Sequence, residues 1–127
     1  MERIGNERTG CSNIVVLVAA GQDIMQGTMV ALNADGYAVP AQKAEGLLIA
    51  GVAQGRADNR LGADGAEAVC VRRGAFVMDN DKTIKETDQL KVAYMADATT
   101  LTLTAAGSSP VGRILEVAED GVTVQIG

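Results

Sequence analysis

The feature that most constrains this chain is the spacing of its apolar runs, which are short and separated by glycine. The 127 residues include 15 Gly but only one Phe, two Tyr and no Trp. Frequent Gly between short Val-rich runs is typical of tight turns between strands and argues against long helices. We count seven to nine short strands and no convincing amphipathic helix. The sequence therefore predicts an all-β fold, a compact small barrel or sandwich of short antiparallel strands.

The first predicted hairpin is "TMVALNADGYAVPA" (28–41), which has an Asp-Gly pair near its middle. A two-residue turn at Asp35-Gly36 suits this pair, because Gly adopts positive φ freely and Asp tolerates it. The turn predicts three cross-strand pairs: Ala34 with Tyr37, Leu32 with Val39, and Val30 with Ala41.

A second hairpin is predicted at "GRILEVAEDGVTVQIG" (112–127), with Asp120-Gly121 as its turn. This turn pairs Val117 with Val124 and Leu115 with Ile126 on one apolar face. The opposite face then carries polar side chains: Glu116, Thr123 and Gln125. The alternation predicts a hairpin with one buried and one solvated face.

Other runs predict strands between these hairpins. The apolar run 47–53 predicts a short central strand, and residues 67–79 place Val69 and Val71 on one face. Cys70 and Arg72 then lie on the other face, and Gly74 permits a bulge or bend. Two more strands are predicted at 90–94 and 99–104. The first is expected to place Leu90, Val92 and Tyr94 on one face, and the second to place Leu101 and Leu103 on one face. Loops are expected at 53–65, 79–88 and 105–110.

Residues 1–13 are predicted to form an extended, flexible N-terminal arm, and residues 14–127 a single β domain. The arm is polar and charged, so it cannot bury a face of its own. An arm gains contact area when a partner orders it, which makes Arg3, Ile4 and Arg8 candidate partner contacts. The alternative is that these N-terminal residues are disordered and have no function.

The chain is acidic, with a net charge of −5. Nucleic acids and anionic membranes attract clustered Lys and Arg, so we expect neither as a partner. The N-terminal stretch has no apolar core, which argues against a signal peptide, and the apolar run 13–20 is too short to span a bilayer. We expect Cys11 and Cys70 to be free thiols, because the cytosol, where the chain is expected to be made, keeps thiols reduced. Cys70, in a Val-rich run, is expected in or near the core.

No catalytic residue, cofactor or metal site is predicted. The chain has no His, which removes the commonest general base and most zinc sites. Asp79 and Asp81 resemble the start of a calcium loop, but Ile84 and Leu90 stand where that loop needs Gly and Glu. The loop at Gly107 matches neither a nucleophile elbow nor a phosphate loop.

Arg72 and Arg73 are the remaining candidates for contact with a partner. Neighbouring side chains on a strand point to opposite faces, so at most one of the two shares the face of Cys70. One of them would contact a carboxylate or the backbone of a partner. The alternative is a solvated edge residue or an ion pair within the chain.

Several stretches together resemble the capsid decoration, or cement, proteins of tailed bacteriophages: "AAGQDIMQGTMVAL", "DGYAVPA", "IAGVA", "VCVRRGAFVM", "VAY" and "PVGRILEVAEDGVTVQIG". The resemblance covers about residues 18–127 and lies in the order and spacing of Gly-punctuated strands. It implies a β-tulip or β-clip domain, made in the host cytoplasm, that binds the major capsid protein as a homotrimer. Such proteins sit at threefold or quasi-threefold positions on the outer surface of the virion and stabilise the shell.

Two alternatives stay open. The chain could be another virion component, such as a head-fibre base or a tail part. The stretch "AxxDIxxG" (20–27) also resembles the start of β-clip domains in sugar-acid dehydratases and antifreeze-like modules, which leaves a non-catalytic, ligand-binding β-clip domain as the other possibility. None of these interpretations makes the chain an enzyme.

Overall fold

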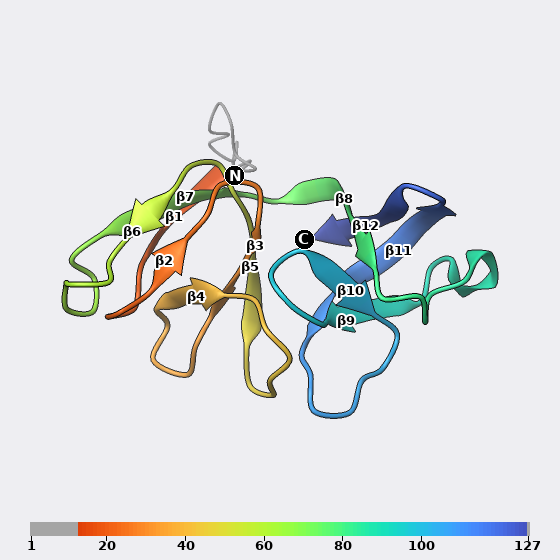
Figure 1. The fold of residues 1–127 in the computed structure, drawn as a ribbon, viewed down its shortest axis with the longest axis horizontal. Coiled ribbons are helices and arrows are strands. Elements are labelled where there is room, and N and C mark those ends of the chain that lie inside the picture. The colour runs from red at the N-terminus through yellow and green to blue at the C-terminus, as the bar shows by residue number, and fades with distance from the viewer. Residues whose placement is uncertain (1–12, 127) are drawn as a thin grey trace, which may run out of the picture.

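The computed structural model describes residues 13–126, and the regular secondary structure of this part of the chain consists almost entirely of strands (Figure 1). The predicted all-β fold is confirmed. The strands in chain order are β1 (Asn13–Leu17), β2 (Asp23–Ile24), β3 (Met29–Leu32), β4 (Ala38–Pro40), β5 (Leu48–Ala53), β6 (Ala57–Asp58), β7 (Ala68–Arg72), β8 (Gly74–Asn80), β9 (Val92–Met95), β10 (Thr100–Thr102), β11 (Pro110–Ala118) and β12 (Gly121–Ile126). A single 3-10 turn, η1 (Glu86–Asp88), precedes β9. The described residues thus hold twelve strands rather than seven to nine, because several are only two or three residues long.

The first half of the chain forms a five-stranded antiparallel sheet in the order β1-β7-β5-β3-β4. The run 47–53 supplies its middle strand, β5, as predicted. The sheet curls until its ends approach each other, because Val18, just after β1, bridges to Ala38 of β4. A two-stranded ribbon, β2–β6, lies on the same side of the molecule (Figure 1). The predicted loop 53–65 therefore contains a short strand.

The second half forms a closed barrel in the order β10-β8-β12-β11-β9. Arg73 separates β7 from β8, which begins at Gly74, and the chain passes from the curled sheet to the barrel there (Figure 1). One pair in this barrel is parallel, β8 with β10, where Thr100 pairs with Asp79. The prediction of antiparallel strands was wrong for this pair, because β10 enters between β8 and β9 and completes the ring.

Two apolar clusters form the core, and β3 contributes to both. Met29 and Ala31 face one cluster and Val30 the other, as the alternation of side chains along a strand requires. One cluster lies within the curled sheet: Val18, Ile24, Val30, Ala38, Ala50, Ala53, Ala57, Val69 and Val71. The second joins strands of the sheet to the barrel: Ala19, Met29, Ala31, Val39, Ala41, Val52, Met78, Ile84, Ala93, Met95, Leu101, Val111, Ile114, Val122, Val124 and Ile126. This shared cluster fixes the two halves against each other.

The register of the first hairpin differs from the prediction by one residue. Leu32 pairs with Ala38, and Val30 pairs with Pro40. The backbone N–H of Gly36 donates to the carbonyl of Asn33, and Asn33 N–H donates to the carbonyl of Tyr37. The loop therefore has three residues, with Gly36 (φ +85°) in the left-handed position that follows a tight turn. The Oδ1 atom of Asn33 accepts from the N–H groups of Asp35 and Tyr37 and holds this loop.

The second hairpin turns at Glu119-Asp120, one residue earlier than predicted. Ala118 pairs with Gly121, and Val117 pairs with Val122 rather than Val124. A bulge at Leu115 then shifts the register, so that Ile114 faces the core and Leu115 is only half-buried. Gly121 lies in β12 because the strand passes close to β8: a Cβ atom there would lie 2.6 Å from the carbonyl oxygen of Met78.

The predicted orientation of the strand near residue 92 was also wrong. Ala93 and Met95 of β9 are buried, whereas Val92 and Tyr94 are half-buried and Leu90 is exposed before the strand begins. In the run 99–104, Leu101 is buried as expected, but Thr102 is buried too. The hydroxyl of Thr102 lies 3.3 Å from that of Thr83, which satisfies its polar group.

Candidate interaction surface

The outer face of β1 and β7 carries apolar side chains that are at least half exposed. Val15 is 70% exposed and Leu17 is 50% exposed. Val15 pairs with Cys70 and Leu17 with Ala68, and both partners on β7 are exposed. Val69 and Val71 point the opposite way, into the cluster within the curled sheet. We call Val15, Leu17, Ala68, Cys70 and Arg72 the β1–β7 face.

Cys70 was predicted in or near the core, and that prediction was wrong. The thiol is exposed because only one face of β7 is packed, and Cys70 lies on the other. The alternation predicted for Val69, Cys70, Val71 and Arg72 is confirmed, so the error lay in assuming that the polar face would also be covered.

Arg72 and Arg73 have separate surroundings. Arg72, opposite Asn13 in the register, is exposed at one end of the β1–β7 face. Arg73 is half-buried, and its Nη1 atom donates to the carbonyls of Ile49 at 3.3 Å and Ala50 at 3.0 Å. Arg73 therefore binds the backbone of its own chain, while Arg72 remains accessible to a partner. The other candidate contacts, Arg3, Ile4 and Arg8, lie outside the described residues, as does Cys11.

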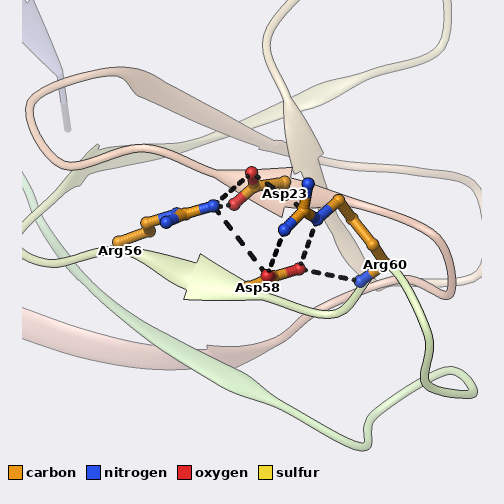
Figure 2. Close-up of polar contacts among 4 residues, drawn as sticks. All are labelled: Asp23, Arg56, Asp58 and Arg60. Atoms are coloured by element: carbon orange, nitrogen blue, oxygen red, sulfur yellow. Dashed lines mark hydrogen bonds and ion pairs between the residues drawn. The ribbon is translucent and has the colours of Figure 1, made fainter.

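Four charged side chains form a cluster on the β2–β6 ribbon: Asp23, Arg56, Asp58 and Arg60 (Figure 2). Asp23 of β2 accepts from Nε and Nη2 of Arg56 at 3.1 and 2.9 Å. Asp58 of β6, which pairs with Asp23, accepts from Nε and Nη2 of Arg60 at 2.9 and 2.8 Å. The guanidinium groups offset the repulsion between two carboxylates placed opposite each other. The signal for this cluster was "RADNR" (56–60), which sequence reasoning assigned to a loop.

These contacts lower the pKa of both carboxyl groups. The side-chain hydrogen bonds from Arg60, together with its backbone N–H, lower the pKa of Asp58 to about 2. Hydrogen bonding to Arg56 lowers the pKa of Asp23. Both carboxyl groups are therefore ionised at neutral pH and act as acceptors for arginine, which is a structural role and leaves neither as a general acid.

Asn59 organises the loop that follows β6. Its side chain is buried, and Nδ2 donates to three carbonyls, of Val18, Ala19 and Ala63, at 2.9–3.1 Å. Among residues 13–126, its Oδ1 atom has no hydrogen-bond partner. Leu61, at the tip of this loop, is fully exposed. Sequence reasoning missed Asn59, because a single Asn in a polar loop carries no pattern.

The acidic loop after β8 is held by its own side chains. Asp81 Oδ1 accepts from the backbone N–H of Thr83 at 3.0 Å, and Asn80 Nδ2 donates to the carbonyl of Ile84 at 2.8 Å. Among residues 13–126, no three Cys, Asp or Glu side chains are grouped so that they could hold a metal ion. In the same part of the chain, no helix has the length and apolar character needed to cross a membrane.

The chain was compared with protein-family models, curated proteins and solved structures, and none of them matched it.

Proposed function

We propose that this chain is a structural protein that decorates and stabilises the outer surface of a bacteriophage capsid. In this proposal it acts as a homotrimer at threefold or quasi-threefold positions, where it binds the major capsid protein and has no enzymatic role. The β1–β7 face is the observation that carries the proposal. It places exposed Val15 and Leu17 on the same face as Arg72, a combination suited to a protein partner.

Charge and family resemblance support the same function. A net charge of −5 favours solubility at the high local density of a decorated shell and disfavours contact with released DNA. The resemblance of the Gly-punctuated strands to decoration proteins lies in residues that form β2 to β12. The charged cluster and Asn59 have hydrogen-bond partners within the chain and stabilise the fold.

The test is co-sedimentation of the purified protein with mature, DNA-free heads of its parent phage. We expect saturable pelleting at about one copy per capsid subunit, and no binding to isolated capsid monomers, because the site is formed between subunits. Equal binding to monomers and shells, or no pelleting of folded protein, would overturn the proposal. In the second case, another virion component or a ligand-binding domain becomes the better assignment.

Matched variants then locate the binding face. Val15→Asp places a charge on the β1–β7 face, whereas Val77→Asp places one on the exposed face of β8, where Val77 is 57% exposed. We expect Val15→Asp to abolish pelleting and Val77→Asp to retain it, with circular dichroism confirming that both are folded. A protein lacking residues 1–12 tests Arg3, Ile4 and Arg8: shell affinity that stays unchanged removes them as contacts.

A further inference from the structure

We propose that the β1–β7 face of one copy packs against the same face of a second copy, so that the free protein forms a weak, two-fold symmetric dimer. The inference goes beyond the proposed function, because it concerns the protein in the absence of a shell. The position of this face, the charges at its two ends and its limited size carry the argument.

The β1–β7 face lies on the side of the curled sheet that is remote from the barrel. The sheet closes as a ring in the order β1-β7-β5-β3-β4, and the bridge between Val18 and Ala38 joins its ends. Met29 and Ala31 of β3 belong to the cluster shared with the barrel, and the strands across the ring from β3 are β1 and β7. Figure 1 shows these two strands on the left and the barrel on the right. A second copy therefore reaches this face without meeting the barrel.

One end of the face is basic. Arg72 is the last residue of β7 and pairs with Asn13, the first residue of β1. Its side chain is exposed, and among residues 13–126 no carboxylate forms an ion pair with it. The guanidinium group is therefore available to a carboxylate from another molecule.

The opposite end of the face is acidic. Leu17 adjoins the loop that precedes β7, because a Cβ atom at Gly65 would lie 3.5 Å from Cδ1 of Leu17. That loop carries Asp64 and Glu67, which are both exposed. Asp64 Oδ1 accepts from the N–H of Ala20 at 2.7 Å, whereas Glu67 forms no ion pair within the described part of the chain. The two unlike ends are about 17 Å apart along β7, at about 3.4 Å per residue.

These charges make the face complementary to itself. In a two-fold contact the same patch is used by both copies, and an axis near Cys70, in the middle of β7, makes the two β7 strands run in opposite directions. Arg72 of each copy then meets Glu67 of the other. Two equivalent ion pairs flank an apolar centre that contains Val15 and Leu17, and unlike charges on the two surfaces fix their register. This complementarity identifies the occupant as a second copy of this chain.

The size of the face sets the strength of the dimer. Stable interfaces bury about 1,200–2,000 Å², whereas this face consists of a few outward side chains on two five-residue strands. The net charge of −5 on each copy also opposes association. The dimer is therefore weak and forms at high protein concentration. Because the proposed shell contact uses the same face, a shell competes with the second copy, and the dimer dissociates when the protein binds.

The first test is sedimentation velocity of the full chain under reducing conditions, from about 10 µM to about 1 mM, the range in which weak complexes associate. We expect the sedimentation coefficient to rise with concentration to that of a dimer. Val15→Asp should weaken the dimer about tenfold or more, because it places an unpaired charge in the apolar centre, and Val77→Asp on β8 should leave it unchanged. Sedimentation as a monomer throughout, or as a trimer, would overturn the dimer, and normal pelleting of the same protein with shells would leave the proposed function standing.

A pair of charge reversals tests the two-fold arrangement. Arg72→Glu alone, or Glu67→Lys alone, places like charges together in its own dimer, so each variant should self-associate about tenfold more weakly or less. In an equimolar mixture of the two variants both ion pairs again join unlike charges, so the mixture should dimerise about as strongly as the unaltered protein. A mixture that does not recover contradicts the arrangement, because mixing does not repair a general loss of stability.

The exposed thiol of Cys70 reports the position of the axis. Packed sheets lie about 10 Å apart, so the two Cys70 thiols face each other within reach of a bis-maleimide with a two-carbon linker. We expect this reagent to give a covalent dimer with Cys11→Ser and none with Cys70→Ser. If the covalent dimer instead persists in Cys70→Ser and is lost in Cys11→Ser, the two copies meet through another surface, and the inference is wrong.

Discussion

The carbonyl oxygen of Gln125 occupies the space that a side chain at Gly112 would need, since an ideal Cβ atom there would lie 1.8 Å from that oxygen. Gly112 belongs to β11, which pairs with both β9 and β12, and Gln125 is a backbone partner on β12. The absence of a side chain at this position allows β11 and β12 to approach each other closely enough to pair.

We expect Gly112→Ala to destabilise the protein by about 2 kcal/mol or more, because the clash is with backbone that a rotamer change cannot relieve. The control is Gly55→Ala, where a Cβ atom meets nothing within 4 Å, and its effect should lie within about 0.5 kcal/mol. Urea unfolding followed by circular dichroism measures both. Equal stability of the two variants would show that β11 and β12 can separate without loss.

The same substitution, Asn to Asp, should destabilise the protein strongly at Asn59 and only weakly at Asn33. Asn59→Asp replaces a buried donor to three carbonyls with an acceptor, so unfolded protein or a loss of about 3 kcal/mol or more is expected. Asn33→Asp keeps the oxygen that accepts from Asp35 and Tyr37, so its cost should stay below about 1 kcal/mol. Thermal unfolding at neutral pH compares the two, and similar losses would contradict the assigned roles.

Acid should weaken the β2–β6 ribbon in a defined pH range. The pKa of Asp58 is about 2 in the folded chain, below the value of about 3.9 in an unfolded chain. The folded state thus favours the ionised carboxylate, and this stabilisation is complete above about pH 4 and lost as the pH falls toward 2. Asp58→Asn should flatten the fall in stability over that range, whereas Asp120→Asn, in the exposed turn, should leave it unchanged. Denaturant titrations at stepped pH measure the difference.

Arg73 should matter for stability and Arg72 should not. Removing the Nη1 donor by Arg73→Ala leaves the carbonyls of Ile49 and Ala50 without this partner, at an expected cost of about 1–2 kcal/mol. Arg72→Ala removes an exposed side chain and should change stability by less than about 0.5 kcal/mol. A larger loss for Arg72→Ala than for Arg73→Ala in chemical unfolding would reverse these roles.

The existence of strands was predictable from the sequence, and their register was not. Alternation in 67–72 located Val69 and Val71 in the core, because a strand with one packed face leaves a period-two pattern. Both Asp-Gly pairs, by contrast, predicted two-residue turns whose register was wrong by one residue. Gly36 occupies the left-handed position of a three-residue loop, and Gly121 meets the backbone of Met78. A glycine required for close approach between distant strands looks the same in the sequence as a glycine required for a turn.

The candidate surface was predictable only in part. Arg72 was identified because adjacent side chains diverge on a strand, but Val15 and Leu17 were not, since "NIVVL" suggests a strand buried on both faces. Whether an apolar side chain is covered depends on distant strands, and β1 lies at the end of the sheet order. The charged cluster depends in the same way on β2 and β6, which are far apart in the chain and two residues long.

The pairing of β8 with β12 has a consequence for synthesis on the ribosome. β12 is the last strand of the barrel to be made, and it pairs with β8 from Met78 to Gly74 through five register positions. The strands of the curled sheet all precede β8, so that half of the fold can assemble while translation continues. β8, however, must wait with one edge unpaired until β12 leaves the exit tunnel. A nascent chain stalled before that point presents this edge to chaperones and to neighbouring nascent chains, and release of the last strand completes the barrel.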